Sequence, residues 1–362
     1  MRMRELWILG RGYRAPWLAT VLAVVVSVGL DAQVASQAQL PPQPGFLTPE
    51  AEAALPLRIE SITPNLYRAI RGASVVAVLV TDEGILLVDT ISTDFAALLR
   101  TELARRFPGK PVKYVVQTHY HWDHSSGGPL FADTATFVAH ENMRTNLRLP
   151  IAQAPPPGET TDLDGDNRLN RTEAQTATRR NFDSFDKDKD GFLSAEEISA
   201  NVRWPEVVFK GDRHTLTIGG KPVELVWARN RHTSDTIDVY FPTERVLFAG
   251  DYTNLISMCC NFAFDHRPMQ TWIASYKVLE TLDFDRVFTN HGQMGDKASL
   301  VAFRQYLEEI YAAVSEGIKA GRTVEELQRT VRLEKHKDRL GYEQQRAAVI
   351  QSAYDSLTKY SR

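Results

Sequence analysis

Three histidines and an aspartate lie within six positions of one another in this chain. His119, His121, Asp123 and His124 follow Thr118 and a short apolar run, so we expect them in a loop at the end of a buried strand. Neutral imidazole nitrogens and carboxylate oxygens are the ligands that zinc accepts where no thiolate is present. A single histidine is more often a surface or core residue, but this density of donors predicts a site for a pair of metal ions.

The segments before this loop predict the elements that hold it. Residues 74–81 and 85–89 are rich in aliphatic side chains and flank an Asp-Glu-Gly turn, which is typical of a β-hairpin. A helix is expected after Ser92 or Thr93, because apolar residues recur there at helical spacing until a Pro-Gly pair. Residues 112–117 then form the short strand that leads into the histidine loop.

Later segments continue the alternation of strands and helices. We expect strands at residues 215–218, 223–227, 236–241 and 245–249, and long amphipathic helices from about residue 297 onwards. Alternating strands and helices in both halves of the chain predict an α/β fold built of layers.

The histidine loop resembles the His-x-His-x-Asp-His motif of the metallo-β-lactamase superfamily. Three later segments resemble motifs of the same family, in the same order: the segment around His232, the strand end that leads to Asp251, and the segment around His291. The resemblance covers nearly all of the chain after its N-terminal segment, except for an acidic insert.

This resemblance implies the domain organisation. We expect a metallo-β-lactamase αββα sandwich whose first half occupies residues 57–153 and whose second half, with the C-terminal helices, occupies residues 202–362. A small EF-hand-like helical segment at residues 158–201 is inserted between the two halves.

The resemblance also implies two metal sites that share one ligand. One ion would be bound by His119, His121 and His232, the second by Asp123, His124 and His291, and Asp251 would bridge them. Two zinc ions per chain are expected, with iron or manganese as alternatives. Asp123 is the expected catalytic residue, because it would orient a hydroxide that bridges the two ions; such a pair of ions lowers the pKa of the shared water and polarises the substrate. Asp89, at a strand end, is expected to support the site rather than bind metal.

The residue type at position 251 is related to the class of substrate. In one large group of β-lactamases of this superfamily the corresponding residue is a cysteine, and in another it is a serine. An aspartate resembles instead the glyoxalase II, lactonase and phosphodiesterase branches. We therefore expect a hydrolase of a small ester, thioester, lactone or lactam.

Other function classes stay as alternatives. A dedicated β-lactamase is the first, because Asp123 and His124 resemble the second site of one lactamase group. A non-catalytic calcium-binding protein on the same fold is another. A redox enzyme is disfavoured, since His121 stands where the diiron oxygen reductases of the superfamily have a glutamate.

The acidic insert contains two twelve-residue loops with oxygen-bearing side chains at positions 1, 3, 5, 9 and 12. This is the EF-hand pattern, in which Ca²⁺ binds carboxylates, a backbone carbonyl at position 7 and a glutamate at position 12. Gly191 occupies the sharp turn of the second loop and Asn167 that of the first; asparagine also adopts positive φ. We expect one or two calcium ions, with ligands from Asp162, Asp164, Asp166, Arg168 and Glu173 in the first loop and Asp186, Asp188, Asp190, Phe192 and Glu197 in the second.

Leu169 and Leu193 stand at the apolar eighth position through which paired loops contact each other. The loops begin only 24 residues apart, so a single helix must follow the first loop and precede the second. Prolines 155–157 stand before the first loop, where no helix is expected. The alternative is a solvated acidic hairpin without calcium. Because the insert enters between the metal motifs, our hypothesis is a calcium-stiffened lid or wall beside the metal cleft, with a structural rather than a sensing role.

The N-terminus predicts export. Four arginines precede an uncharged apolar run at residues 17–30, and small residues follow, which together are typical of a secretory signal peptide. The signal and the start of a linker occupy residues 1–38, with cleavage expected after Ala32 or Ala38. An uncleaved anchor is the alternative, but the run is shorter than the roughly 20 apolar residues of a spanning helix. We expect a periplasmic or secreted protein without stable membrane insertion after cleavage.

The net charge is −3, from 42 Lys and Arg against 45 Asp and Glu, so nucleic acid is not an expected partner and a small-molecule substrate is. The two cysteines, Cys259 and Cys260, are adjacent, which excludes a scaffold held by disulfides. Four histidines lie outside the motifs and are not expected to bind metal: His140, His214, His266 and His336.

Overall fold

The computed structural model describes residues 54–148, 162, 164–174, 178–179, 181–228, 231–258 and 268–359. The expected signal peptide, Cys259, Cys260 and His266 lie outside the described residues.

The first sheet has seven strands in the order β1-β2-β3-β4-β5-β6-β9. Strands β1 to β4 pair antiparallel, whereas β4, β5, β6 and β9 pair parallel. The β3–β4 hairpin and the strand before the histidine loop are confirmed. The strands span Arg58–Ser61 (β1), Leu66–Arg71 (β2), Ser74–Val80 (β3), Ile85–Val88 (β4), Val112–Val116 (β5), Thr136–His140 (β6) and Val207–Phe209 (β9).

The second sheet has six strands in the order β10-β11-β12-β13-β14-β15. Only the β13–β14 pair is parallel; the other neighbours are antiparallel. The four strands expected in this half are present, with ends that differ by at most two residues. The strands span Arg213–Ile218 (β10), Lys221–Val226 (β11), Asp238–Phe241 (β12), Val246–Ala249 (β13), Arg286–Thr289 (β14) and Met294–Asp296 (β15).

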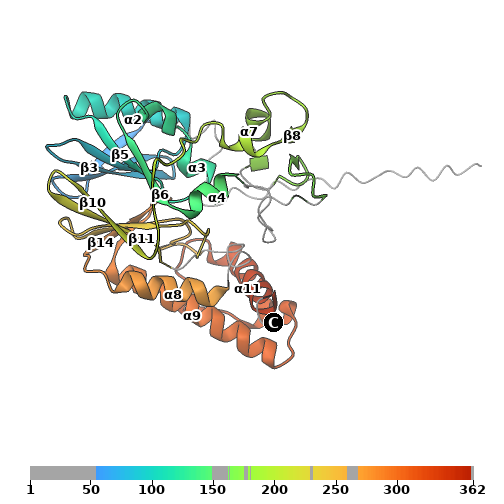
Figure 1. The fold of residues 1–362 in the computed structure, drawn as a ribbon. Coiled ribbons are helices and arrows are strands. Elements are labelled where there is room, and N and C mark those ends of the chain that lie inside the picture. Colours follow the sequence, from blue (N-terminus) through green and yellow to red (C-terminus); the bar gives the residue numbers. More distant parts are fainter. Residues whose placement is uncertain are drawn as a thin grey trace, which may run out of the picture. The chain divides into compact units, whose positions relative to one another are not determined.

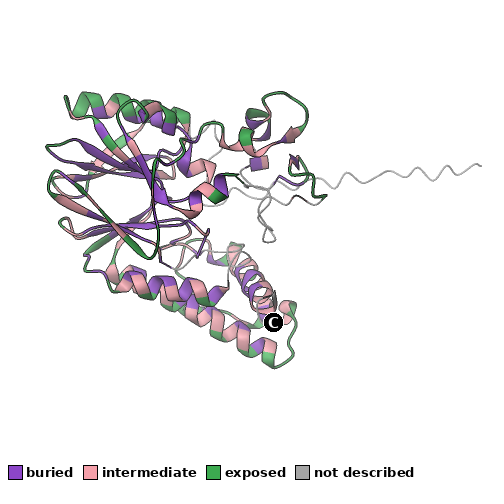
Figure 2. Cartoon of the chain, viewed as in Figure 1, coloured by how far each residue is buried: buried purple, intermediate pink, exposed green. Residues whose placement is uncertain are grey.

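A buried apolar layer lies between the two sheets. It joins side chains of β2 to β6 with side chains of β10 to β14, among them Leu79, Val116, Leu225 and Phe248, all fully buried. In Figure 2 most residues along the strands of both sheets are coloured as buried. Burial of apolar area on this scale is the main stabilising contribution to a layered fold.

Helices cover the outer faces of both sheets (Figure 1). Helix α2 (Thr93–Arg106) packs on the first sheet through Phe95, Leu99 and Leu103, and Ser92 caps its N-terminus, as expected. On the second sheet, α8 (Met269–Glu280) and α9 (Lys297–Lys319) pack with α10 (Val324–Thr330) and α11 (Tyr342–Lys359) in one apolar cluster. The αββα sandwich inferred from the sequence is therefore confirmed.

The short elements lie at one end of the sandwich and in the insert. The turn α3 (Trp122–Ser125) follows β5, and α4 (Asn142–Arg148) follows β6. The 3₁₀ turn η1 (Gly128–Phe131) precedes β6 and contacts α2. The insert contains β7 (Leu169–Asn170), α6 (Phe182–Phe185), β8 (Phe192–Leu193) and α7 (Ala195–Ser199). A last 3₁₀ turn, η3, spans Glu334–His336.

Within the described part of the chain, none of the helices is both long and apolar enough to cross a bilayer.

Candidate metal centre

The histidine loop begins where β5 ends. His119 is fully buried, and its Nδ1 lies 3.0 Å from the hydroxyl of Thr118. The loop closes as a single helical turn, α3, whose backbone bonds run from His124 N and Ser125 N to the carbonyl of His121. This turn carries Asp123 and His124 in fixed positions beside the strand end.

The remaining predicted ligands come from the second sheet. Asp251 follows β13 and His291 follows β14, so the parallel pairing of these strands brings both residues to the same edge. His232 lies on the loop between β11 and β12. Loops at the carboxyl ends of parallel strands commonly carry the functional residues of α/β proteins.

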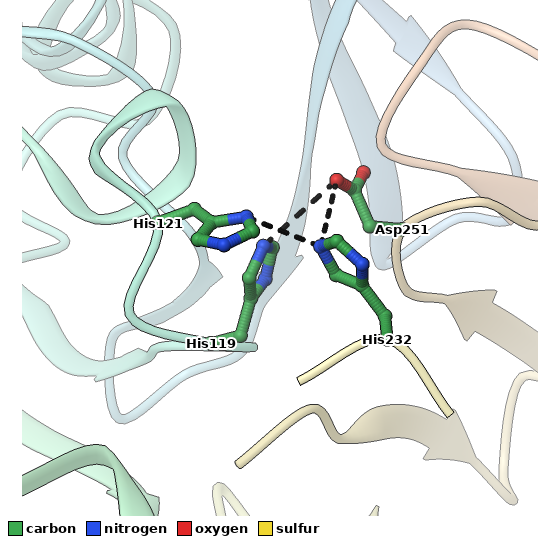
Figure 3. Close-up of side chains that lie close together, drawn as sticks. All are labelled: His119, His121, His232 and Asp251. Carbon is green, nitrogen blue, oxygen red and sulfur yellow. Dashed lines mark hydrogen bonds and ion pairs between the residues drawn. The ribbon is translucent and has the colours of Figure 1, made fainter. Parts of the chain in front are cut away.

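Two groups of donors form at this edge. His119, His121, His232 and Asp251 each offer a donor atom within 4.8 Å of the others, and Figure 3 shows these four side chains directed toward one another. Asp123, His124 and His291 form the second group by the same measure. The structure thus brings together the two ligand sets inferred from the sequence.

Asp251 lies between the two groups. Its Oδ2 is 3.8 Å from His119 Nε2 and 3.6 Å from His232 Nε2, both in the first group. The same oxygen is 3.3 Å from His124 Nε2, and Oδ1 is 2.8 Å from His291 Nε2. One carboxylate therefore faces donors of both groups, as a bridging ligand must.

The donors fit divalent metal ions. Nε2 of His119 is buried and has no hydrogen-bond partner among the described residues. Buried polar atoms without partners are costly unless something absent from the protein chain binds them. Moreover, in the first group the distances of 3.1 Å from His232 Nε2 to His121 Nδ1 and 3.8 Å from His119 Nε2 to Asp251 Oδ2 bracket the edge of about 3.3 Å of a tetrahedron with zinc–nitrogen bonds of about 2.0–2.1 Å.

The electrostatics of the site favour an ionised Asp251 carboxylate and a neutral His119 imidazole. Burial, together with the neighbouring His124, His121 and His232, holds the pKa of His119 well below its usual range. Burial alone would raise the pKa of Asp251, but His124 and His291 hold it well below the usual value. Burial would lower the pKa of His124 and of His291, but the Asp251 carboxylate beside them raises both above the usual value. Imidazole nitrogens bind metal only when they are unprotonated, so the low pKa of His119 suits metal binding directly, whereas a cation at the second group must displace protons from His124 and His291.

Asp89 supports the site, as expected from the sequence. It is fully buried, and its carboxylate accepts hydrogen bonds from Thr118 N at 2.8 Å, Thr118 Oγ1 at 2.7 Å and Asn290 Nδ2 at 2.7 Å. Its Oδ2 also lies 3.5 Å from Nδ1 of His124. The roles of Thr118 and Asn290 were not predicted from the sequence, where their positions beside His119 and His291 were the available signal.

A buried ion pair joins Arg231 and Asp238, on either side of His232 in the chain. Both Nη atoms of Arg231 donate to the carboxylate of Asp238 at 2.6 Å, and the backbone N–H of Gly250 donates to the same carboxylate at 2.9 Å. The pair ties the chain on either side of His232 to the residue before Asp251. No sequence signal marks it, because a charged residue is normally expected at the surface.

The other described histidines are not part of the centre. His140 stacks on Trp227 with ring centroids 5.1 Å apart, and His214 stacks on Phe209 at 5.3 Å. His336 lies 3.2 Å from a carboxylate oxygen of Glu309.

The acidic insert forms two further groups of carboxylates. Asp162, Asp164 and Glu173 lie within 4.8 Å of one another by their oxygens, and so do Asp186, Asp188 and Glu197. The other two acidic candidates, Asp166 and Asp190, are outside these groups, and both carboxylates form ion pairs with Arg168. The guanidinium of Arg168 also lies over the ring of Phe192, 4.1 Å from its centroid.

Comparison with known proteins assigns the family. The model of the metallo-β-lactamase superfamily matches residues 70–291, which include every donor of the two histidine-containing groups. The chain therefore belongs to the metallo-β-lactamase superfamily, and the expectation of a metal-dependent hydrolase of this superfamily is confirmed at the level of the class.

Two curated relatives are similar in sequence. The α subunit of 2,4-dinitroanisole O-demethylase from Nocardioides sp. (strain JS1661) is 25% identical over 286 residues, which cover 77% of this chain and 70% of that protein. The linear primary-alkylsulfatase of Pseudomonas sp. (strain ATCC 19151) is 27% identical over 251 residues, which cover 65% of this chain and 43% of that protein.

Among solved structures, the inverting sec-alkylsulfatase Pisa1 from Pseudomonas sp. matches 85% of this chain with a TM-score of 0.57 at 14% identity. A double mutant of the sec-alkylsulfatase matches 86% with the same TM-score at 16% identity. At such identities the similarity shows the fold alone. This chain spans 51% of the length of each of these alkylsulfatase structures.

Proposed function

We propose that this protein is an exported hydrolase of a small ester that uses two divalent cations, which we take to be zinc. The observation that carries the proposal is the position of Asp251, whose carboxylate faces His119 and His232 on one side and His124 and His291 on the other. Sites of this donor set that keep open positions are typical of catalytic zinc.

When bound, two cations lower the pKa of a shared water, polarise the reacting group of the substrate and position it. The chain's own residues would prepare this chemistry. Asp89 fixes the orientation of His124 and of the loop at Thr118. The Asp123 carboxylate is 38% exposed and lies 3.6 Å from His124 Nε2, so it can orient the attacking water and accept its proton.

The relatives widen the range of candidate substrates. To the ester, thioester, lactone and lactam inferred from the sequence, we add a sulfate ester of an alkyl chain and an aryl methyl ether, because the two curated relatives are named for these groups. All require a nucleophilic oxygen and a stabilised anionic leaving group, which a two-metal site supplies.

The test combines metal analysis with a substrate panel. The purified protein is expected to hold about two zinc ions and to hydrolyse at least one of a chromogenic lactam, a thioester, a lactone, an aryl ester, an alkyl sulfate and a nitroaryl methyl ether. His121→Ala and Asp251→Ala should abolish turnover. His214→Ala is the matched control, because His214 stacks on Phe209 away from the donors. Turnover of the lactam alone would favour the dedicated β-lactamase, and a zinc-free protein that is inert after zinc addition would refute the proposal.

For the insert we propose calcium binding at both loops. The backbones of Asn167 and Gly191, at the sixth position, have φ of 65° and 85°. Leu169 pairs with Leu193 in the antiparallel β7–β8 ladder, which joins the two loops as the eighth positions of paired EF-hands are joined. In addition, Oδ1 of Asp186 is buried without a hydrogen-bond partner among the described residues.

The calcium proposal is tested by titration of the full chain. Glu197→Gln should weaken calcium binding at one site on the order of tenfold or more, because the twelfth residue supplies both of its oxygens. Glu196→Gln removes the same charge from the adjacent position, which is outside the carboxylate group, and should leave binding unchanged. Equal effects of the two variants, or no binding by the unaltered chain, would refute the proposal.

Export is proposed from the N-terminal sequence. Expression of the full chain in a Gram-negative host should yield a periplasmic or secreted protein whose new N-terminus follows Ala32 or Ala38. Protein that keeps its first residues and stays in the membrane fraction would instead indicate an uncleaved anchor.

A further inference from the structure

The insert has its own small apolar core, and a residue of the metal loop completes it. Leu169, Phe182, Phe185 and Leu193 are buried together within the insert. Trp122 packs against this cluster, with its ring edge-to-face on Phe185 at a centroid distance of 5.1 Å. The insert therefore contacts the metal loop through a large aromatic side chain, not only through surface polar groups.

Trp122 stands between two predicted ligands, His121 and Asp123, and it is the first residue of α3. The turn is closed by hydrogen bonds from His124 N to the His121 carbonyl and from Ser126 N to the Trp122 carbonyl. Because the turn is rigid once closed, the position of the indole also sets the position of the Asp123 and His124 backbone.

The chain that leaves the insert also contacts the metal loop. Gly127 N donates to the Asn201 carbonyl at 2.9 Å, and Ser126 forms a β-bridge with Val202. Before the loop, Gln117 Nε2 donates to the Arg203 carbonyl at 2.9 Å. The residues at 201–203 follow α7 closely, and α7 contains Glu197.

Two of the three side chains of the second donor group are partly exposed. The side chain of Asp123 is 38% exposed and that of His291 is 28% exposed, whereas His124 is buried. In the first group only His121 is partly exposed, and His119, His232 and Asp251 are buried. The Asp123 carboxylate lies 3.6 Å from His124 Nε2, its neighbour on the same turn. We therefore expect the position of Asp123 to follow the α3 backbone and the packing of Trp122 on the insert.

We propose that the insert positions the metal loop, and that Trp122 is the positioning residue through which it acts. Packing of Trp122 into the insert core sets the affinity for the cation held by Asp123, His124 and His291. The inference rests on the two-cation site proposed above. It also gives the insert a role in metal binding, beyond that of a wall beside the cleft.

The experiment is a double-mutant cycle in the full chain, with zinc affinity measured by competition against a chromophoric chelator. Trp122→Ala and Phe185→Ala should each weaken binding of the second zinc ion by about 10–100-fold, the range seen when a group that orients a metal ligand is removed. The first zinc ion should bind with an affinity changed by less than about twofold. The double variant should lose no more than either single variant, because both changes break one coupling.

Two further variants separate positioning from general stability. Trp122→Phe keeps an aromatic side chain for the insert core and should recover most of the second-site affinity. Leu103→Ala truncates a buried residue of α2, in a different apolar cluster, and should lower the melting temperature without changing either zinc affinity. Thermal unfolding of each variant is measured in parallel.

Independent, multiplicative losses in the double variant, or single variants with unchanged affinity for the second zinc ion, would overturn the inference. Those outcomes differ from a failure of the proposed function, in which the unaltered chain itself binds no pair of zinc ions.

Discussion

At the scale of single residues, the centre depends on charged groups that are buried and paired. Asp89 accepts three hydrogen bonds and its carboxylate lies beside His124 Nδ1. Arg231 forms a bidentate ion pair with Asp238. A carboxylate buried this way is stabilised only while its donors are present. We therefore expect Asp89 to affect both stability and metal binding, and the Arg231–Asp238 pair to affect stability.

The first prediction concerns Asp89→Asn. The substituted amide nitrogen would face the donors of Thr118 or Asn290, so one hydrogen bond is lost and His124 loses the carboxylate beside its Nδ1. We expect zinc affinity to fall by about 10–100-fold and stability to fall by about 1–3 kcal/mol. Chelator competition and urea unfolding measure the two quantities. Unchanged zinc affinity would show that Asp89 only stabilises the fold.

The second prediction concerns Arg231→Met. The change leaves the buried Asp238 carboxylate without its cation, and we expect a loss of about 3–5 kcal/mol in the free energy of unfolding. Arg245→Met is the matched control, because Arg245 pairs with Asp283 and Asp285 at an exposed site, where an ion pair adds little. Urea unfolding compares the two; equal losses would contradict the assignment of the buried pair.

At the scale of elements, helix ends and strand ends place the functional groups. The carboxyl ends of β5, β13 and β14 present His119, Asp251 and His291 at one edge. On the second sheet, α9 begins at a capping box in which Asp296 accepts from Ser299 N at 2.8 Å, directly after β15. The helix therefore starts at a defined residue and covers the sheet that carries Asp251 and His291.

The third prediction concerns this cap. Asp296→Ala should destabilise the protein by about 1 kcal/mol, whereas Asp296→Asn, which also caps well, should cost little.

The contribution of this cap should depend on pH. Hydrogen bonds from Ser299 lower the pKa of Asp296. A lowered pKa in the folded state means that this stabilisation is present at neutral pH and is lost as pH falls through the folded-state value. The stability difference between aspartate and alanine should therefore shrink in acid. Thermal unfolding across pH tests it, and a difference that grows in acid would contradict it.

At the scale of the whole molecule, the metal donors join the two sheets. His119, His121, Asp123 and His124 follow a strand of the first sheet, while His232, Asp251 and His291 follow strands of the second. The apolar layer between the sheets includes Val116, Phe248 and Phe288, from the strands that lead to these loops. Bound cations should therefore add to the stability of the sandwich and not only to its chemistry.

The fourth prediction follows from this placement. Removal of metal by chelation should lower the melting temperature, and added zinc should restore it in proportion to the logarithm of its free concentration. At a free concentration 100 times the dissociation constant, one site adds about 2.7 kcal/mol. Calorimetry of the full chain over a zinc series measures this, with Asp251→Ala as the control that should respond weakly. A melting temperature independent of zinc would mean that the ions do not bind the folded chain preferentially.

The sequence by itself determined the class of the site and most of the fold. The spacing of His119 to His124, the order of the later motifs and the alternation of strand and helix patterns are local properties, so they could be read without coordinates. The β3–β4 hairpin, the cap at Ser92 and the start of α9 were predicted for the same reason.

Only the tertiary structure decided which distant groups meet. The contacts of Asp89 with Asn290, of Arg231 with Asp238 and of Trp122 with Phe185 join residues whose side chains give no sign of a partner along the chain. Each depends on the pairing of strands into two sheets and on the packing of the insert against the loop. Such contacts arise from the arrangement of whole elements, which local residue patterns constrain only in part.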